Sequence, residues 1–254
     1  MMNHIKSELL DRTDKVIHGF FQRTGGVSPA PFDSLNFSKK REGGQNFLKN
    51  LEIAANELGL DINNTVLVNY DHCYDVIKVG RQNIGEGIFK PHTIPHADGI
   101  LAAERDVTLM TIHADCVPIF LLDSNKEIIC LCHAGWRGVY SHIAVKAVDL
   151  MCENGADADD IICAVGPCIE KCCFEVSQSL ADDFALEFGS NAAHGRNIDL
   201  RACLDSDLIS CGVQKHNIEH FGLVHTATAS FIFLTDVIRK NAALWALFWR
   251  LNKF

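Results

Sequence analysis

The segment VTLMTIHADCVPIFLLDSNKEIICLCHAGWRGVY, residues 107–140, decides the fold. It holds three short apolar runs, at 107–112, 117–122 and 127–132, and polar residues separate them. Apolar runs of this length bounded by turn residues are typical of buried strands. Several strands in succession favour a layered sheet over a fold in which every strand is followed by a helix.

Similar patterns occur on both sides of this segment. Further strands are predicted at 17–22, 65–69, 75–79 and 161–165, and helices at 46–58, 140–153 and 177–188. Asn154-Gly155 supplies a C-terminal stop for the second helix. Residues 80–98 contain three glycines and two prolines and predict a long surface loop. We therefore expect an α/β (α+β) fold, with residues 1–254 in a single domain built as a sheet sandwich covered by helices.

Composition limits the classes of partner. The chain has 254 residues, 48% hydrophobic and 22% charged, which is ordinary for a globular protein. A formal net charge of −9 argues against nucleic acid or a membrane as a partner, since both favour basic patches. The N-terminal segment MMNHIKSELLDRTDK is polar and unlike a secretory signal. These features predict a cytoplasmic protein, and they do not define an oligomeric state.

The eleven cysteines argue against a disulfide framework, because their number is odd and no signal precedes them. Four lie in apolar contexts that predict burial as small hydrophobic side chains: Cys130, Cys132, Cys163 and Cys211. The segment PCIEKCC lacks the usual Cys-x-x-Cys spacing and a second pair, so it does not predict a metal site.

Reactive side chains follow or end two of the predicted strands. Cys116 follows Ala114-Asp115, His133 lies where an apolar run ends, and His72 lies between two further strands. Two imidazoles and a thiolate suit zinc, and three protein ligands leave a fourth position open for water or substrate. The three residues are far apart in the sequence. Spacing alone therefore also allows the alternative that each histidine is a hydrogen-bonded structural residue.

Four ordered blocks resemble the signature of one bacterial family: HGFFQRTGGVSPAPFDSLNFS (18–38), ADCVPIFLLD (114–123), HAGWRGVY (133–140) and AVGPCIEKCCFEV (164–176). The family has been labelled multicopper polyphenol oxidase or laccase-domain protein. It is now described as zinc-dependent purine nucleoside phosphorylase with adenosine deaminase and methylthioadenosine phosphorylase activities. The resemblance spans about residues 16 to 225.

This resemblance implies a fold and a ligand set. The fold would be an α/β sandwich similar to that of a deamidating bacterial toxin with a Cys-His pair. The metal ligands would be His72, Cys116 and His133, with Cys116 and His133 also catalytic. The substrates would be a purine nucleoside and phosphate.

Residues around the ligands also have predicted roles. Gly135 would let the chain turn tightly, so that substrate approaches the backbone. Arg23 and Arg137 are candidates to bind phosphate, Arg137 because it lies near a predicted helix start. The alternatives are a solvated loop arginine for Arg23 and a carboxylate partner for Arg137. Asp115 would orient a zinc-bound histidine or water, or would cap a turn.

The chain departs from the family pattern at three places. Leu51 replaces an arginine in the helix before His72, which threatens phosphate handling. Cys73 replaces the glycine after that histidine, which alters the turn or adds a second thiol near the metal. The tail, 226–254, diverges altogether.

In and just before that tail, His225 stands where the family has a cysteine, and Thr226 persists. Arg239 is the one arginine where two arginine blocks should fall. The final apolar residues ALWALFW still fit a buried strand or helix. These losses call turnover into question more than the fold.

Three alternatives to a zinc nucleoside enzyme remain open at this point. The first is copper-dependent oxidation of phenols, disfavoured because the chain lacks histidine-dense blocks. The second is metal-free catalysis by a Cys116 nucleophile and a His133 base, acting on peptidoglycan precursors. The third is a non-catalytic protein stabilised by its metal.

Overall fold

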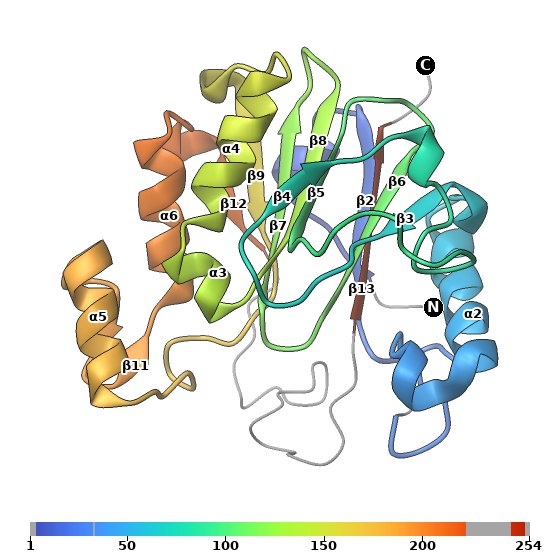
Figure 1. Cartoon of the computed structure of the whole chain (residues 1–254), viewed down its shortest axis with the longest axis horizontal. Helices are drawn as coiled ribbons and strands as arrows, with labels where there is room; N and C mark the ends of the chain where they lie inside the picture. The colour runs from blue at the N-terminus through green and yellow to red at the C-terminus, as the bar shows by residue number, and fades with distance from the viewer. Residues whose placement is uncertain (1–3, 33, 222–244, 252–254) are drawn as a thin grey trace.

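Two β-sheets lie against each other in the computed structural model, which describes residues 4–32, 34–221 and 245–251 (Figure 1). The five-stranded sheet has the order β1 (His4–Ile5), β2 (Val16–Phe21), β13 (Trp245–Leu251), β6 (Thr108–His113) and β3 (Thr65–Leu67). The six-stranded sheet has the order β12 (Ile218–His220), β9 (Ile161–Val165), β7 (Val117–Asp123), β8 (Ile128–Ala134), β5 (Gly99–Ala102) and β4 (Val76–Lys78).

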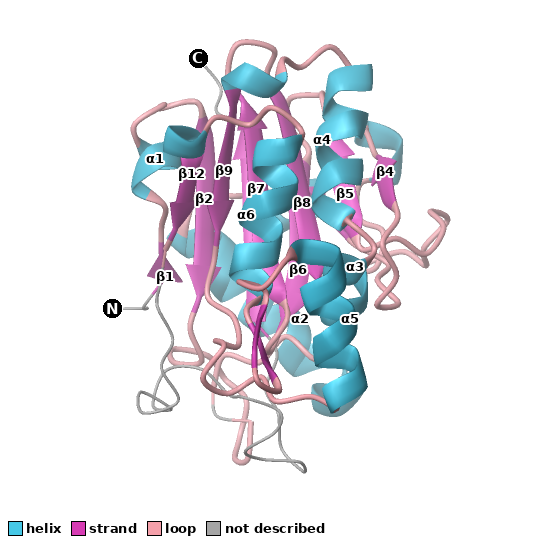
Figure 2. Cartoon of the chain, turned by 90° about the vertical axis from the view of Figure 1, so that its left-hand side faces the viewer, coloured by secondary structure: helices cyan, strands magenta, loops and turns pink. Residues whose placement is uncertain are grey.

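Helices cover the outer faces of both sheets (Figure 1). The helices are α1 (Glu8–Asp11), α2 (Lys39–Glu57), α3 (Trp136–Tyr140), α4 (Ile143–Glu153), α5 (Gln178–Phe188) and α6 (Leu200–Ser210). Short 3-10 helices lie at Ile62–Asn64, Arg81–Asn83, Ala158–Asp160 and Lys215–Asn217, and β10 (Ala193–His194) pairs with β11 (Asn197–Ile198). Figure 2 shows α3, α4 and α6 on the six-stranded sheet, whereas α2 packs on the five-stranded one.

Strand β7 explains why the sandwich forms. Ile119 and Leu121 pack in the cluster between the six-stranded sheet and its helices. Phe120 and Leu122 point the other way, into the cluster between the two sheets. Because successive side chains of a strand alternate between faces, burial of both faces requires an uninterrupted apolar run. The run at 117–122 therefore marks a strand in the middle of the sandwich, and the predicted layered α/β architecture is confirmed.

All seven predicted strands are present, with shifts of one or two residues at their ends. The helix predicted at 140–153 is α4, which begins three residues later; the short helix α3 precedes it, and His142 between the two takes a left-handed conformation (φ 59°). The predicted stop of α4 is confirmed by Asn154 and by Gly155 at φ 100°. Helix α2 begins at Lys39, earlier than predicted.

The sequence patterns missed α6, β5 and β12, and they left the tail undecided between strand and helix. Residues 245–251 form strand β13, paired with β2 and β6. His225, Thr226 and Arg239 lie outside the described residues. No helix in the described part of the chain is long and apolar enough to cross a membrane.

The cysteine prediction is confirmed at Cys130, Cys132 and Cys163, which are buried. It is wrong at Cys211, which is half-buried after the end of α6. All eleven cysteines are free thiols.

The segment 80–98 is irregular, but the prediction of a surface loop is only partly right. Glu86 is 3% exposed, and its carboxylate accepts hydrogen bonds from Asn83 Nδ2 (3.1 Å), Thr93 N (2.7 Å), Thr93 Oγ1 (2.6 Å) and Ile94 N (3.1 Å). Burial opposes ionisation, but these donors outweigh it and lower the pKa of Glu86 to about 2. The Glu86 carboxylate thus links Asn83 to Thr93 and Ile94 and holds these parts of the segment together.

Replacement of Glu86 by glutamine should destabilise the protein by about 2 kcal/mol at neutral pH, because an amide cannot accept all four bonds. The folded pKa lies below the ~4.3 of an unfolded glutamate, so the carboxylate stabilises fully above that value. Its contribution is lost as pH falls toward about 2. Urea unfolding of both proteins between pH 7 and pH 2.5 measures this, and a difference that does not narrow on acidification would contradict it.

Candidate metal centre

Three side chains from distant parts of the chain meet at one place. His72 lies in the loop between β3 and β4, Cys116 directly precedes β7, and His133 lies near the end of β8. Antiparallel pairing of Pro118 with His133 brings the start of β7 beside the end of β8. The ligand atoms of the three side chains lie within 4.8 Å of one another. Two imidazoles and a thiolate are donors that a transition metal prefers, so the residues present fit a metal ion.

One buried carboxylate holds this group together. Asp98, fully buried, accepts a hydrogen bond from His133 Nδ1 at 2.7 Å through Oδ1. Its Oδ2 accepts from the backbone amides of Asp71 (3.1 Å) and Cys73 (2.8 Å) on either side of His72. Its carbonyl accepts from the backbone N–H of His133 at 2.7 Å. Asp98 therefore fixes the position of both histidine-bearing segments, with Nε2 of His133 left to face the thiol.

Sequence reasoning missed Asp98 because it falls in a segment taken for a loose loop. It gave Asp115 the role of orienting a histidine, but the carboxylate on His133 Nδ1 is Asp98. Asp115 is half-buried, and its backbone carbonyl accepts from Ile169 N at 2.9 Å. The predicted catalytic role of Asp115 stays a prediction.

The centre favours a thiolate at Cys116. Burial opposes ionisation of this thiol, but the charge of His133 and hydrogen bonds from both ligand histidines outweigh it and lower the Cys116 pKa to about 6. Burial also disfavours a charged His133, yet the Cys116 thiolate and Asp98 raise the His133 pKa to about 9. Both shifts favour the charged forms of Cys116 and His133, and a metal that binds the imidazole would displace its proton.

Two further aromatic side chains enclose the ligands. The Tyr70 ring lies 4.8 Å from the His133 ring and 6.0 Å from the His72 ring. The His113 ring lies 4.9 Å from that of His133, but its nitrogens bond Thr111 Oγ1 (2.8 Å) and the Cys116 carbonyl (3.1 Å). His113 therefore packs against His133 while its own nitrogens are engaged with Thr111 and Cys116. His96 is exposed, and neither His113 nor His96 belongs to the ligand group.

Gly135 lies against the ligands. A Cβ atom at this position would be 3.3 Å from Cys116 Sγ and 3.6 Å from His72 Nδ1. Its backbone (φ −70°, ψ 166°) is open to any residue, so space rather than conformation calls for glycine here. Gly135 therefore lies beside the ligand atoms, and its place beside the substrate stays a prediction.

A Gly135→Ala protein should fold normally but bind its metal more weakly, because the new methyl group crowds Cys116 and His72. We expect a few-fold rise in the metal dissociation constant, with unfolding temperature in excess chelator unchanged. Competition against a chromogenic chelator measures the first and circular dichroism the second. Gly155→Ala, at a site with open space around it, controls for a general effect of the methyl group, although its φ of 100° adds local strain.

The two predicted phosphate arginines lie in different settings. Arg137 is exposed in α3 with its guanidinium 4.2 Å over the Trp136 ring. Arg23 is half-buried, and its carbonyl accepts from the amides of Ser34 and Leu35. Their phosphate roles stay predictions.

The departures from the family pattern have local explanations. Leu51 is fully buried in the apolar cluster under α2, so the side chain at this position serves packing here. Its neighbour Asn50 bonds Val27 N, Ser28 Oγ and Asn36 O and holds the glycine-rich loop. Cys73 keeps the turn, since His72 takes the left-handed φ of 53° and the Cys73 thiol donates to Asp98 at 3.0 Å.

A layered α/β protein with a His-Cys-His group at the ends of its central strands is the class that fold and site define. The family model described as "Multi-copper polyphenol oxidoreductase laccase" matches residues 17–233. The chain belongs to this family.

Relatives with named activities cover most of the chain. Purine nucleoside phosphorylase YlmD of Bacillus subtilis is 31% identical over 86% of this chain and 82% of that protein. Purine nucleoside phosphorylase LACC1 of Mus musculus is 33% identical over 81% of this chain, which spans 48% of that protein. Adenosine deaminase RL5, from an unknown prokaryotic organism, is 33% identical over 65% of this chain and 66% of its own.

Solved structures confirm the fold. The hypothetical protein YfiH of Bacillus licheniformis superposes with a TM-score of 0.86 at 26% identity, covering 93% of both chains. YlmD of Geobacillus stearothermophilus gives a TM-score of 0.87 at 24% identity, over 94% of this chain and 93% of that one.

Proposed function

We propose that this chain is a zinc-dependent purine nucleoside phosphorylase that also deaminates adenosine and cleaves methylthioadenosine. The observation that carries the proposal is the convergence of His72, Cys116 and His133 within 4.8 Å, in a family whose named relatives include purine nucleoside phosphorylases and an adenosine deaminase. We also propose that the protein is cytoplasmic, because its eleven thiols are free and suit a reducing compartment. We further propose that the chain forms a single catalytic domain.

Zinc is proposed over copper from the donor set. Two imidazoles and one thiolate match catalytic zinc sites, which keep one position open. A multicopper cluster needs further histidines, and His113 has both ring nitrogens engaged. The bound ion would act as a Lewis acid that polarises substrate or lowers the pKa of a water.

Phosphorolysis makes a simple demand on the protein. A phosphate oxygen bonds to the anomeric carbon of the sugar while the carbon–nitrogen bond to the purine breaks. The electron pair of that bond passes to the purine nitrogen, which takes up a proton and leaves as the free base. The protein must orient both reactants, exclude water and place positive charge around the phosphate. Deamination instead adds water to the purine ring and releases ammonia.

This chain's residues suit these tasks as follows. Asp98 holds His133 in one tautomer and orientation through the 2.7 Å hydrogen bond. Gly135 leaves room beside the ligand atoms for the reacting part of the substrate. Tyr70 covers the His133 ring and shields it from water.

The test combines metal content with turnover. Protein purified without added metal should contain one zinc per chain by elemental analysis and should release hypoxanthine from inosine only when phosphate is present. A His72→Ala variant should lose both properties, while His194→Ala, an exposed residue distant in sequence from the ligands, should keep them. Bound copper with phenol oxidation, or nucleoside turnover unaffected by loss of His72, would contradict the proposal.

One observation favours a second candidate, metal-free covalent catalysis. Cys116, His133 and Asp98 form a nucleophile–base–carboxylate series, with the thiol pKa lowered to about 6. Such a series would suit hydrolysis of an amide, for example in a peptidoglycan precursor. The test is amide hydrolysis by protein from which a chelator has removed the metal. If that activity persists and iodoacetamide then abolishes it, this candidate would be favoured over the zinc enzyme.

A further inference from the structure

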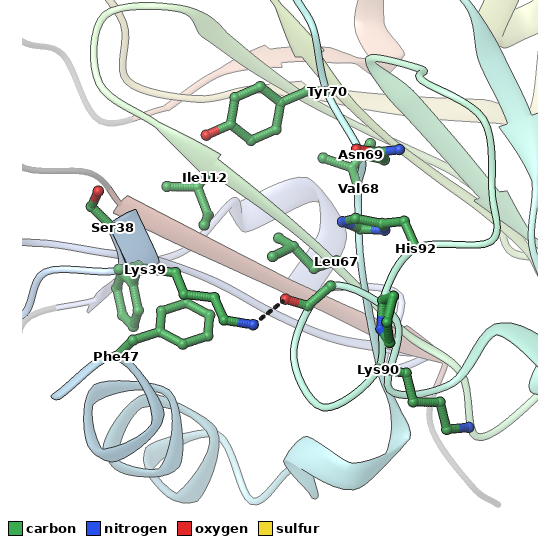
Figure 3. A pocket seen from close by; sticks show the side chains of 13 residues that line it. Ser38, Lys39, Phe47, Leu67, Val68, Asn69, Tyr70, Lys90, His92 and Ile112 are labelled. Atoms are coloured by element: carbon green, nitrogen blue, oxygen red, sulfur yellow. Dashed lines mark hydrogen bonds between the residues drawn. The ribbon is translucent and has the colours of Figure 1, made fainter. Parts of the chain in front are cut away.

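A pocket of about 470 Å³ is shown in Figure 3, and Tyr70 of its lining connects it to the metal centre. Its walls are the start of α2, the chain after β3, the loop 87–92 and the end of β6: Phe37, Ser38, Lys39, Phe47, Leu67, Val68, Asn69, Tyr70, Gly87, Lys90, Pro91, His92 and Ile112. Tyr70 belongs to this wall and also stacks 4.8 Å from the His133 ring. A ligand that contacts Tyr70 in the pocket would therefore lie across this one ring from His133.

The charge of the pocket differs from that of the protein. The chain carries a formal net charge of −9, yet the lining residues that the structure describes include two lysines and no acidic side chain. Lys90 donates to the carbonyl of Ile84 at 2.9 Å, and its ammonium points away from the pocket in Figure 3. Among the described residues of the lining, Lys39 is therefore the cation that faces the pocket. A basic recess on an acidic protein selects for anions.

Lys39 retains capacity to bind a ligand. Its ammonium contacts the carbonyls of Gly87 and Ile88 at 3.4 and 3.2 Å, which are long distances for a charged donor. An ammonium carries three donors, so at least one stays available. These two contacts hold the head group at the pocket wall, where an anion would meet it without a large movement of the side chain.

Helix α2 begins at the same wall. Ser38 is its N-cap residue and is only 5% exposed, but its hydroxyl makes no capping hydrogen bond to the helix. An N-cap hydroxyl ordinarily accepts from an amide of the first turn. Here it lines the pocket, together with the positive end of a 19-residue helix. A hydroxyl that does not cap its own helix, with helix amides beside it, is a group that can bind an oxyanion.

The rest of the pocket accepts an uncharged group. Phe47, Leu67 and Ile112 supply apolar surface, and the volume exceeds what a phosphate alone would fill. The Nδ1 atom of His92 is buried there without a hydrogen-bond partner, and a sugar hydroxyl would provide one. The combination suits a phosphate joined to, or lying beside, a pentose.

We propose that the pocket at the start of α2 is the phosphate subsite of this protein. Ser38, Lys39 and the first amides of α2 bind inorganic phosphate and the sugar 1-phosphate formed from it. The assignment of phosphate as co-substrate rests on the proposed function, whereas the anion site itself rests on the pocket. Lys39 thereby supplies the charge that sequence analysis assigned to Arg23 and Arg137.

Calorimetric titration of inorganic phosphate into the full-length, metal-loaded protein tests the site directly. Lys39→Gln should weaken binding at least tenfold by removing a charge-assisted bond, and Ser38→Ala about threefold. Lys49→Gln makes the same charge change at an exposed position of α2 outside the pocket and should leave binding unchanged. Circular dichroism confirms that each variant is folded.

Three outcomes would overturn the subsite: no heat of binding at millimolar phosphate, unaltered binding in both pocket variants, or loss of binding in Arg137→Gln alone. A steady-state assay separates this proposal from the proposed function. If nucleosides are cleaved, Lys39→Gln should raise the KM for phosphate and leave the KM for nucleoside unchanged. If phosphate binding depends on Lys39 but no nucleoside is cleaved, the proposed phosphate subsite would stand and the proposed phosphorylase activity would be rejected.

Discussion

A Cys116→Ser variant is expected to lose both its metal and its activity. A neutral hydroxyl replaces a thiolate that the surroundings favour, since the Cys116 pKa is lowered to about 6. Loss of residues that merely orient a ligand costs about 10–100-fold in metal affinity, so loss of a ligand should exceed about 100-fold. Elemental analysis after dialysis and the inosine assay measure the two effects.

The fold should survive this change, because Cys116 is half-buried and lies outside the three apolar clusters. Cys152→Ser, at an exposed cysteine in α4, is the matched control and should keep full metal content. A Cys116→Ser protein with one zinc per chain and normal turnover would refute the centre. Retained zinc without turnover would instead assign Cys116 to covalent chemistry.

The fold was predictable because its strands are buried on both faces. Residues 117–122 and 128–132 form uninterrupted apolar runs, and a strand between two packed layers requires such a run. Strand β5 escaped prediction because Gly99–Ala102 is short and follows a segment rich in glycine and proline. Helix α6 escaped because Arg201 and Asp207 are buried on its inner side, where apolar residues would have shown the period.

The site was predictable only in part. His72, Cys116 and His133 could be named because they stand at strand ends within blocks that resemble a family. Their convergence could not be derived from spacing, since it depends on the pairing of β7 with β8. Asp98 carries no local signal, because its role follows from contacts with residues 25 or more positions away. Lys39 and Ser38 likewise acquire meaning only from the pocket that α2 and loop 87–92 form together.

The second large effect is expected for Asp98→Asn. An asparagine side chain offers one oxygen, whereas Asp98 uses both to bond His133 on one side and the amides of Asp71 and Cys73 on the other. Either the imidazole or the backbone around His72 must therefore lose its acceptor. We expect a 10–100-fold loss of metal affinity and destabilisation by about 1–3 kcal/mol, with a matching fall in kcat.

Asp115→Asn separates this mechanism from the role predicted from the sequence. If Asp98 alone orients His133, the Asp115 variant should keep its metal affinity, and any loss of activity there would reflect contact with substrate. Chelator competition and urea unfolding on both variants give the comparison. Equal losses of metal affinity in the two would mean that a hydrogen bond of 2.7 Å to a buried carboxylate does not control His133. A loss confined to Asp98→Asn would show that the carboxylate bridging β5, β8 and the His72 loop sets the geometry of the centre.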